Sequence, residues 1–266
     1  MFRSFNDMMG RKVEVNYPPK RIVSIVPSQT ELLFDLGLDE EVVGITKFCV
    51  HPEEWFRNKM RVGGTKQLHI NKIRELQPDL IIANKEENTQ SQVEELAGEF
   101  PVWISDIQTV AEGRQMINAV GELTGTEEKA REIIAEIESN FAGIRQCAQP
   151  KRVAYFIWRE PWMSVGHDTF ISNMIETIGW VNVFAGSEKY PEVTTENLAA
   201  VKPEVVLLSS EPFPFKEKHM AEVKAVLPEA EVLLVDGEMF SWYGSRMRLA
   251  PGYFNCLHRD LGGLRD

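Results

Sequence analysis

Two segments far apart in the chain share one pattern of residue types. Residues 73–88 read IRELQPDLIIANKEEN, and residues 198–213 read LAAVKPEVVLLSSEPF. Each runs from a helix end through a proline and an acidic residue into four apolar residues and a polar loop. Two further segments, RIVSIV at 21–26 and RVAYFI at 152–157, open the two halves at corresponding points. Repeated strand–helix units predict an α/β fold of two Rossmann-like lobes with mainly parallel sheets.

A long helix is predicted between the two matching halves, over residues 126–148. Its apolar residues recur every three or four positions, which is the spacing of one helical stripe. Thr126 is a good N-cap and Pro150 stops the run. One alternative is a crossover helix within a single sheet. We expect instead that the helix is the only connection between the lobes, with a first lobe at 1–123, a connecting helix at 124–149 and a second lobe at 150–266.

The remaining elements follow from short apolar runs and their capping residues. Residues 1–20 are typical of a short hairpin or arm. Strands are predicted at 21–26, 42–46, 79–83, 101–105, 152–158, 205–209 and 231–235. Helices are predicted at 28–37, 70–76, 90–98, 109–123, 169–179, 195–201, 216–226 and from 252 onward.

Composition excludes several classes of partner. The net charge of −11 argues against binding to nucleic acid or docking on anionic lipid. Three cysteines, widely spaced, do not form a disulfide framework. No apolar run is long enough for membrane insertion. The first twenty residues hold neither a signal-peptide run nor a lipid-anchor cysteine, which predicts a cytoplasmic protein as written, or a periplasmic or extracytoplasmic one if a leader was removed.

Candidate binding residues lie in the loops that follow the predicted strands, because ligands of open parallel sheets bind beyond the strands' carboxyl ends. The first lobe contributes Ser28, Phe48, Cys49, His51, Thr65, Lys66, Asn84, Lys85 and Glu86. The second contributes Trp158, Trp162, Glu211, Phe213, Phe240, Trp242, Tyr243 and Arg246. Large flat side chains with a few charged tips suit a large, planar, partly polar ligand. The alternative for any single aromatic residue is that it covers a sheet edge.

Metal binding and catalysis have weaker signals. His51 with Cys49 is only half of a metal site, and the other histidines are scattered. The common hydrolase, P-loop and zinc-protease motifs are absent from the sequence. The sequence therefore predicts a non-catalytic protein that requires no cofactor. A cytosolic enzyme or metal-chelate processing factor that uses Cys49, His51 and Glu86 is the alternative of another class.

The ordered set RIVSIVPSQTELLFDLGL, VVGIT, VGGT, LQPDLIIA, long helix and VKPEVVLL resembles ABC-transporter substrate-binding proteins of the long-helix type, the helical backbone metal receptors. The segment PSQTE and the aromatic loop ending in Arg246 are most similar to the cobalamin-binding branch. The resemblance implies a corrinoid held in a cleft between the lobes, with Lys66, Lys85 and Arg246 meeting its carboxylate or phosphate groups. A ferric siderophore, haem or a bare metal ion is the alternative ligand.

The resemblance also implies an ABC permease as partner, met by one exposed glutamate on each lobe. Glu196 matches the position in the second lobe, whereas Asn71 occupies the corresponding position in the first. Two exposed charges set a docking orientation. Asn71 therefore weakens the expected coupling to a permease.

Overall fold

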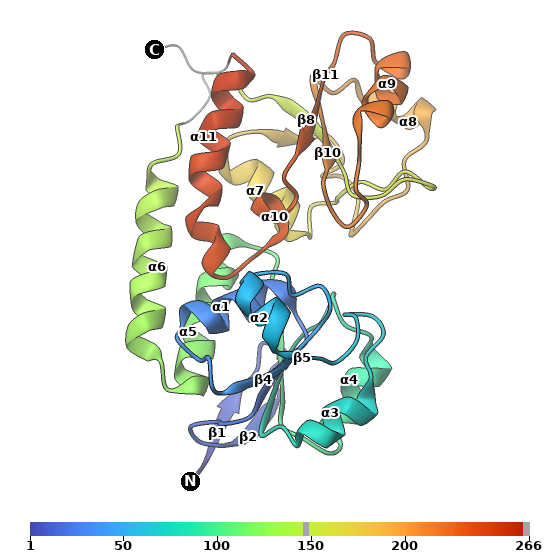
Figure 1. The fold of residues 1–266 in the computed structure, drawn as a ribbon. Coiled ribbons are helices and arrows are strands. Elements are labelled where there is room, and N and C mark those ends of the chain that lie inside the picture. Colours follow the sequence, from blue (N-terminus) through green and yellow to red (C-terminus); the bar gives the residue numbers. More distant parts are fainter. Residues whose placement is uncertain (146–148, 263–266) are drawn as a thin grey trace. The chain divides into compact units, whose positions relative to one another are not determined.

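The computed structural model describes residues 1–145 and 149–262, and the chain divides into two compact units (Figure 1). The first unit comprises Met1–Ile107, Ala111–Glu138 and Tyr243–Arg246. The second comprises Gln108–Val110, Ser139–Trp242 and Met247–Asp266. Because Tyr243–Arg246 belongs to the first unit while both flanking segments belong to the second, the expectation of a single connection through the long helix is wrong. The predicted lobe boundaries at 1–123, 124–149 and 150–266 remain predictions.

The first unit is built on a five-stranded parallel sheet with the order β5-β4-β3-β6-β7. Its strands are β3 (Ile22–Ser24), β4 (Val42–Ile45), β5 (Met60–Arg61), β6 (Leu80–Asn84) and β7 (Val102–Ser105). The central strand β3 and its neighbour β6 are buried along their whole length, as expected of a parallel sheet covered on both faces. A separate antiparallel hairpin is formed by β1 (Phe2–Asn6) and β2 (Lys12–Asn16).

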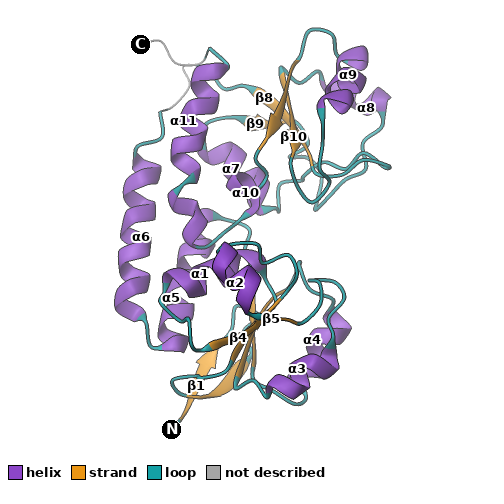
Figure 2. Ribbon diagram, viewed as in Figure 1, coloured by secondary structure: helices purple, strands orange, loops and turns teal. Residues whose placement is uncertain are grey.

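Helices of the first unit pack on its sheet through apolar side chains. Ile73, Val93 and Leu96 join the core cluster that contains the strand residues Val23 and Ile81. The helices are α1 (Pro27–Asp35), α2 (Glu53–Asn58), α3 (Ile70–Leu76), α4 (Gln90–Ala97), α5 (Val110–Thr124) and α6 (Glu127–Ala142). The first residue of α5 and the last four residues of α6 belong to the second unit. Figure 2 shows how these helices alternate with the strands along the chain.

The second unit repeats this plan with four parallel strands in the order β11-β10-β8-β9. They are β8 (Arg152–Phe156), β9 (Val181–Asn182), β10 (Val205–Ser209) and β11 (Glu231–Val235). Leu198 and Val223 pack on one face of the sheet, and Phe240 and Phe254 pack beside Tyr155 of β8. The helices are α7 (Phe170–Thr177), α8 (Thr195–Val201), α9 (Glu217–Val226), α10 (Glu238–Ser241), the 3-10 helix η1 (Ser245–Arg248) and α11 (Ala250–Asp260), with Ser245 and Arg246 of η1 in the first unit.

The internal repeat extends to individual hydrogen bonds. In the first unit, the Asp79 carboxylate accepts the backbone N–H of Arg21, whose guanidinium donates to the carbonyl of Leu76. In the second unit, the Glu204 carboxylate accepts the backbone N–H of Arg152, whose guanidinium donates to the carbonyl of Val201. The residues before the shared proline, Gln77 and Lys202, both adopt positive φ, of 44° and 46°. The prediction of two α/β lobes with parallel sheets is confirmed.

The long helix is shorter than predicted. Helix α6 begins at Glu127 as expected, but it ends at Ala142. Gly143 follows this end, and glycine is typical just past a helix. Of the predicted stripe, Ala130, Ile133 and Ile137 are buried, and Ile144 is buried beyond the helix. Ala148, the predicted last residue, lies outside the described residues.

Most other predicted elements are present, with a few differences. Helix α2 was predicted as loop, although Glu53 and Glu54 in its first turn suit a helix N-terminus. Helix α10 also replaces a predicted loop, and α11 begins at Ala250, two positions before its predicted start. Within the described residues, no helix is both long enough and apolar enough to cross a bilayer.

Candidate functional site

In the first unit, two asparagines tie the loops that follow the strands. The side-chain oxygen Oδ1 of Asn84 accepts hydrogen bonds from the backbone N–H groups of Glu86 at 2.8 Å and Glu87 at 3.0 Å. The Asn88 amide donates to the carbonyls of Ile25 at 3.0 Å and Thr65 at 3.1 Å. Both asparagines are buried. The predicted site residue Asn84 therefore positions a loop and does not face solvent.

The exposed part of this edge carries one aromatic ring and several lysines. Phe48 is 50% exposed, and the Lys47 ammonium lies 5.0 Å from its ring centre. Lys66 donates to the carbonyl of Glu86 at 2.6 Å, and Lys85 forms an ion pair with Asp106 at 2.6 Å. The lysines predicted to meet acidic ligand groups are thus already engaged within their own unit.

Cys49 lies in the core of the first unit. Its side chain is fully buried, and the sulfur lies 3.1 Å from the hydroxyls of Thr30 and Thr46. Burial raises the pKa of the Cys49 thiol to about 11, so the thiol is neutral near pH 7. A neutral, enclosed thiol is neither a nucleophile nor a metal ligand. The structure therefore does not place Cys49 on a binding surface, whereas two other predicted site residues, His51 and Thr65, are partly exposed.

The segment Tyr243–Arg246 is fastened to the first unit by two acidic side chains. The Tyr243 hydroxyl donates to Glu87 at 2.6 Å, and burial together with the Glu87 charge raises the pKa of Tyr243. The Arg246 guanidinium donates to both oxygens of Glu31, at 2.8 and 2.6 Å. The prediction that Arg246 meets a ligand's acidic groups is not supported, because a bidentate partner already occupies its fork.

Gly244 allows this segment to lie close to helix α1. Its φ of +108° is a conformation that favours glycine, and a Cβ there would lie 3.2 Å from the carbonyl oxygen of Ser28. Ser28 itself is buried, at 3% exposure. Ser28 and Tyr243 are therefore covered parts of the first unit and not open surface.

In the second unit, aromatic side chains gather beyond the carboxyl ends of β8 and β10. Trp158 is 40% exposed, and its ring meets that of Phe213 at 5.7 Å. Behind them, Trp162 stacks on Phe215 with ring centres 5.5 Å apart. We call Trp158, Trp162, Phe213 and Phe215 the aromatic surface. The structure brings the three predicted members together, and Phe215 adds a buried support.

The charge beside the aromatic surface is neutralised locally. Arg159 lies 5.6 Å from the Trp162 ring centre and forms ion pairs with Glu222 and Glu160. The carboxylates raise the pKa of Arg159, so it stays charged and paired. The aromatic surface therefore presents flat apolar area beside a compensated charge.

Glu211 fixes the loop that carries the other predicted aromatic residues. One of its oxygens accepts the Ser241 hydroxyl at 2.7 Å and the Trp242 indole N–H at 2.8 Å. Trp242 is only 7% exposed and Phe240 is fully buried against Tyr155 and Phe254. Trp242 therefore supports this loop and Phe240 packs in the core of the second unit. This corrects the prediction that both form part of an open aromatic wall. Burial raises the pKa of Glu211 above its ordinary value.

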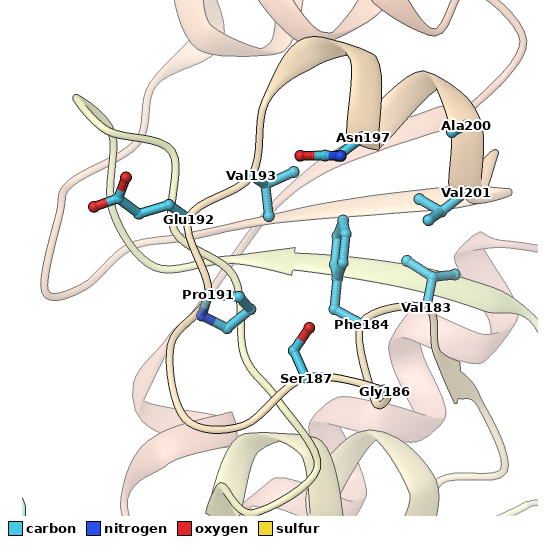
Figure 3. Close-up of a pocket in the computed structure, with 10 residues that line it drawn as sticks. All are labelled: Val183, Phe184, Gly186, Ser187, Pro191, Glu192, Val193, Asn197, Ala200 and Val201. Atoms are coloured by element: carbon cyan, nitrogen blue, oxygen red, sulfur yellow. The ribbon is translucent and has the colours of Figure 1, made fainter.

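A cavity of about 380 Å³ lies elsewhere in the second unit, between α8 and the loop after β9 (Figure 3). Its wall is mainly apolar, with Phe184, Val193 and Val201 facing one another and the Glu192 carboxylate directed away from them. None of the predicted binding residues lines it. This cavity is therefore separate from the residues predicted to bind a ligand.

Two further predictions concern metals and docking. In the ranges 1–145 and 149–262, no three His, Cys, Asp or Glu side chains are grouped so that they could hold a metal ion, His51 included. Glu196 is exposed in the first turn of α8, and Asn71 is exposed on α3, where its side-chain oxygen Oδ1 accepts a hydrogen bond from the Arg74 guanidinium. The shared hydrogen bonds of the repeat place α3 and α8 at equivalent positions of the two units.

Two acidic residues that bind the Tyr243–Arg246 segment were not predicted from the sequence. Glu31 and Glu87 hold the Tyr243–Arg246 segment, yet they lie far from it along the chain. In the sequence, Glu31 is a glutamate in the second turn of α1 and Glu87 is part of an acidic pair after β6. Neither position indicates which distant residue the glutamate binds. Contacts between charged residues that lie far apart in the sequence can be identified only from the folded structure.

Comparison with known proteins gives a consistent result over most of the chain. A family model described as Periplasmic binding protein matches residues 22–229. The Uncharacterized ABC transporter substrate-binding lipoprotein YvrC of Bacillus subtilis is 27% identical over 215 residues, which are 77% of this chain and 68% of the relative. The Vitamin B12-binding protein of Vibrio cholerae is 28% identical over 198 residues, 73% of this chain and 71% of the relative.

A solved structure matches the fold closely. It is the periplasmic heme-binding protein BhuT in complex with two hemes, with a TM-score of 0.79 and 25% sequence identity. The match covers 91% of this chain and 97% of that chain.

Proposed function

The chain belongs to the periplasmic binding protein family, and on this premise we propose that its ligand is a corrinoid or a similar neutral metal chelate. The predicted resemblance to ABC-transporter substrate-binding proteins is confirmed. Members of this family bind solutes and are not enzymes, which agrees with the predicted non-catalytic role. The Cys49 thiol, on which the enzyme alternative depended, is buried and neutral.

The aromatic surface of the second unit carries the proposal. Trp158 and Phe213 offer exposed and half-exposed ring area, with Trp162 and Phe215 packed behind them. Flat aromatic area binds a large macrocycle by stacking and by burial of apolar surface. A bare metal ion or a small polar solute would leave most of this apolar area uncovered.

The ion pairs that basic side chains form within the protein favour a corrinoid over haem as the ligand. Lys85, Arg159 and Arg246 are each bound to a carboxylate of their own unit. A haem brings two carboxylates, and they would have to break these pairs to gain partners of their own. The periphery of a corrinoid is mostly uncharged amides, which need hydrogen-bond partners and no free cations. Haem remains the second candidate, since a haem-binding protein is among the similar structures.

We also propose that the protein delivers this ligand to an ABC permease. The support is the similarity to the ABC transporter substrate-binding lipoprotein of Bacillus subtilis and the exposure of Glu196. Asn71 lacks the charge that a symmetrical pair of docking contacts would use. The expected location of the ligand in a cleft between two lobes, and the compartment in which the chain works, both remain predictions.

Absorbance of freshly purified protein tests the ligand directly. Expression in cells supplied with cobalamin should yield protein with a visible corrinoid spectrum, and cyanocobalamin added to stripped protein should quench its tryptophan fluorescence. If haemin quenches the tryptophan fluorescence and cyanocobalamin does not, the ligand is haem. Absence of any response to cyanocobalamin, haemin or a ferric hydroxamate would contradict the proposed function.

A further inference from the structure

Glu211 is held in an unusual way beside the aromatic surface. It follows β10 and precedes Phe213 by two residues. Its oxygen Oε1 accepts both the Ser241 hydroxyl and the Trp242 indole N–H. These two donors occupy the acceptor capacity of that oxygen and fix the plane of the carboxylate.

The second oxygen of Glu211 is left to solvent. Throughout 1–145 and 149–262, Oε2 accepts no hydrogen bond, and it is not among the buried side-chain atoms that lack a partner. The residue as a whole is only partly exposed. The structure thus presents one fixed acceptor oxygen at the edge that carries Trp158 and Phe213.

Keeping a carboxylate here opposes folding. Its partners are two neutral donors, and no cation pairs with it in the described part of the chain. Burial raises the pKa of Glu211, and the nearby carboxylates of Glu238 and Asp236 raise it further. A half-buried charge without a cationic partner is typical of a binding site and not of a stabilising core.

From this geometry we propose that Glu211 is a specificity-determining residue whose oxygen Oε2 accepts a hydrogen bond from an N–H or O–H group of the bound chelate. The inference rests on the proposed function and names the ligand chemistry more closely. Amide N–H groups at the edge of a corrinoid are suitable donors, while carboxylates of a haem are repelled by the same oxygen. Glu211 therefore selects for amide-bearing over carboxylate-bearing macrocycles.

The Glu211→Gln variant tests this with little change in shape. The Trp242 indole N–H can only donate, so the glutamine carbonyl takes the inner position and its NH₂ group faces outward, while the Ser241 hydroxyl can donate to that carbonyl or to the carbonyl of Gly237. The outward group changes from acceptor to donor while the loop stays anchored. Glu238→Gln removes the same charge from the neighbouring helix α10 and serves as the control for long-range electrostatics.

Titration of each protein with cyanocobalamin and with haemin, followed by tryptophan quenching, gives the readout. Glu211→Gln should weaken cyanocobalamin binding by about tenfold or more and should strengthen haemin binding, because the lost acceptor is charged. Glu238→Gln should change neither ligand by more than about twofold. A merely structural role would weaken both ligands together, and that result would overturn the inference.

The outcomes separate this inference from the proposed function. If wild-type protein binds cyanocobalamin and Glu211→Gln binds both ligands as the wild type does, the inference alone is wrong. If wild-type protein binds neither macrocycle, the proposed function fails, and the inference fails with it. Melting curves of the three proteins show whether each is folded during the titration.

Discussion

The contact between Arg246 and Glu31 gives the sharpest prediction about stability. Both side chains are largely buried, at 9% and 16% exposure, and the guanidinium reaches both carboxylate oxygens at 2.8 and 2.6 Å. Removing one partner of such a pair leaves an uncompensated charge, which costs about 3–5 kcal/mol. Arg246→Met should therefore destabilise the protein by about 3 kcal/mol or more, and Glu31→Gln by a similar amount.

A double-mutant cycle separates the pair from its surroundings. Urea unfolding of the wild type, the two single variants and the double variant yields the coupling free energy. We expect a coupling of about 2 kcal/mol, because the double variant no longer buries a lone charge. A coupling below about 0.5 kcal/mol, the value of an exposed pair, would refute the structural role of Arg246.

Three further predictions concern single side chains. Trp158→Ala should weaken binding of cyanocobalamin by about tenfold in a quenching titration, since stacking area is lost; unchanged affinity would exclude the aromatic surface as the site. A thiol reagent should label Cys256, which is exposed, in the native protein and Cys49 only after unfolding, as mapped by peptide mass; rapid labelling of native Cys49 would contradict its burial. Burial raises the pKa of Glu211 in the folded protein above its value in the unfolded chain. The folded protein is therefore most stable with respect to this group at pH values below the unfolded-state pKa, where Glu211 is neutral in both states. This stability is lost as the pH rises through the folded-state pKa. Glu211→Gln should therefore melt above the wild type by a margin that grows as the pH rises above the ordinary glutamate pKa, as measured by scanning fluorimetry, and a constant margin would be evidence against the buried charge.

The fold could be predicted from local pattern because its repeating unit is local. The sequence around Pro78 and that around Pro203 each specify a helix end, a left-handed residue and a buried strand. Helix α6 was predicted too long because apolar spacing continues past Ala142, where Gly143 ends the helix. Periodicity reports which face is apolar and does not report where the helix stops.

The candidate site was predicted less completely, for a different reason. Sequence placed Trp158, Phe213 and Glu211 in loops after strands, and the structure places them at that edge of the second unit. It could not show that Phe240 packs against Tyr155 or that Glu31 pairs with Arg246, since both contacts join distant segments. Aromatic and charged loop residues look alike in sequence whether they meet a ligand or each other.

Calorimetric titration of ligand-free protein shows directly whether the ligand is a corrinoid. We expect saturable binding of cyanocobalamin near one equivalent, weaker binding of haemin, and no heat from divalent metal ions alone. Binding of haemin or a bare metal ion in preference to cyanocobalamin would contradict this expectation.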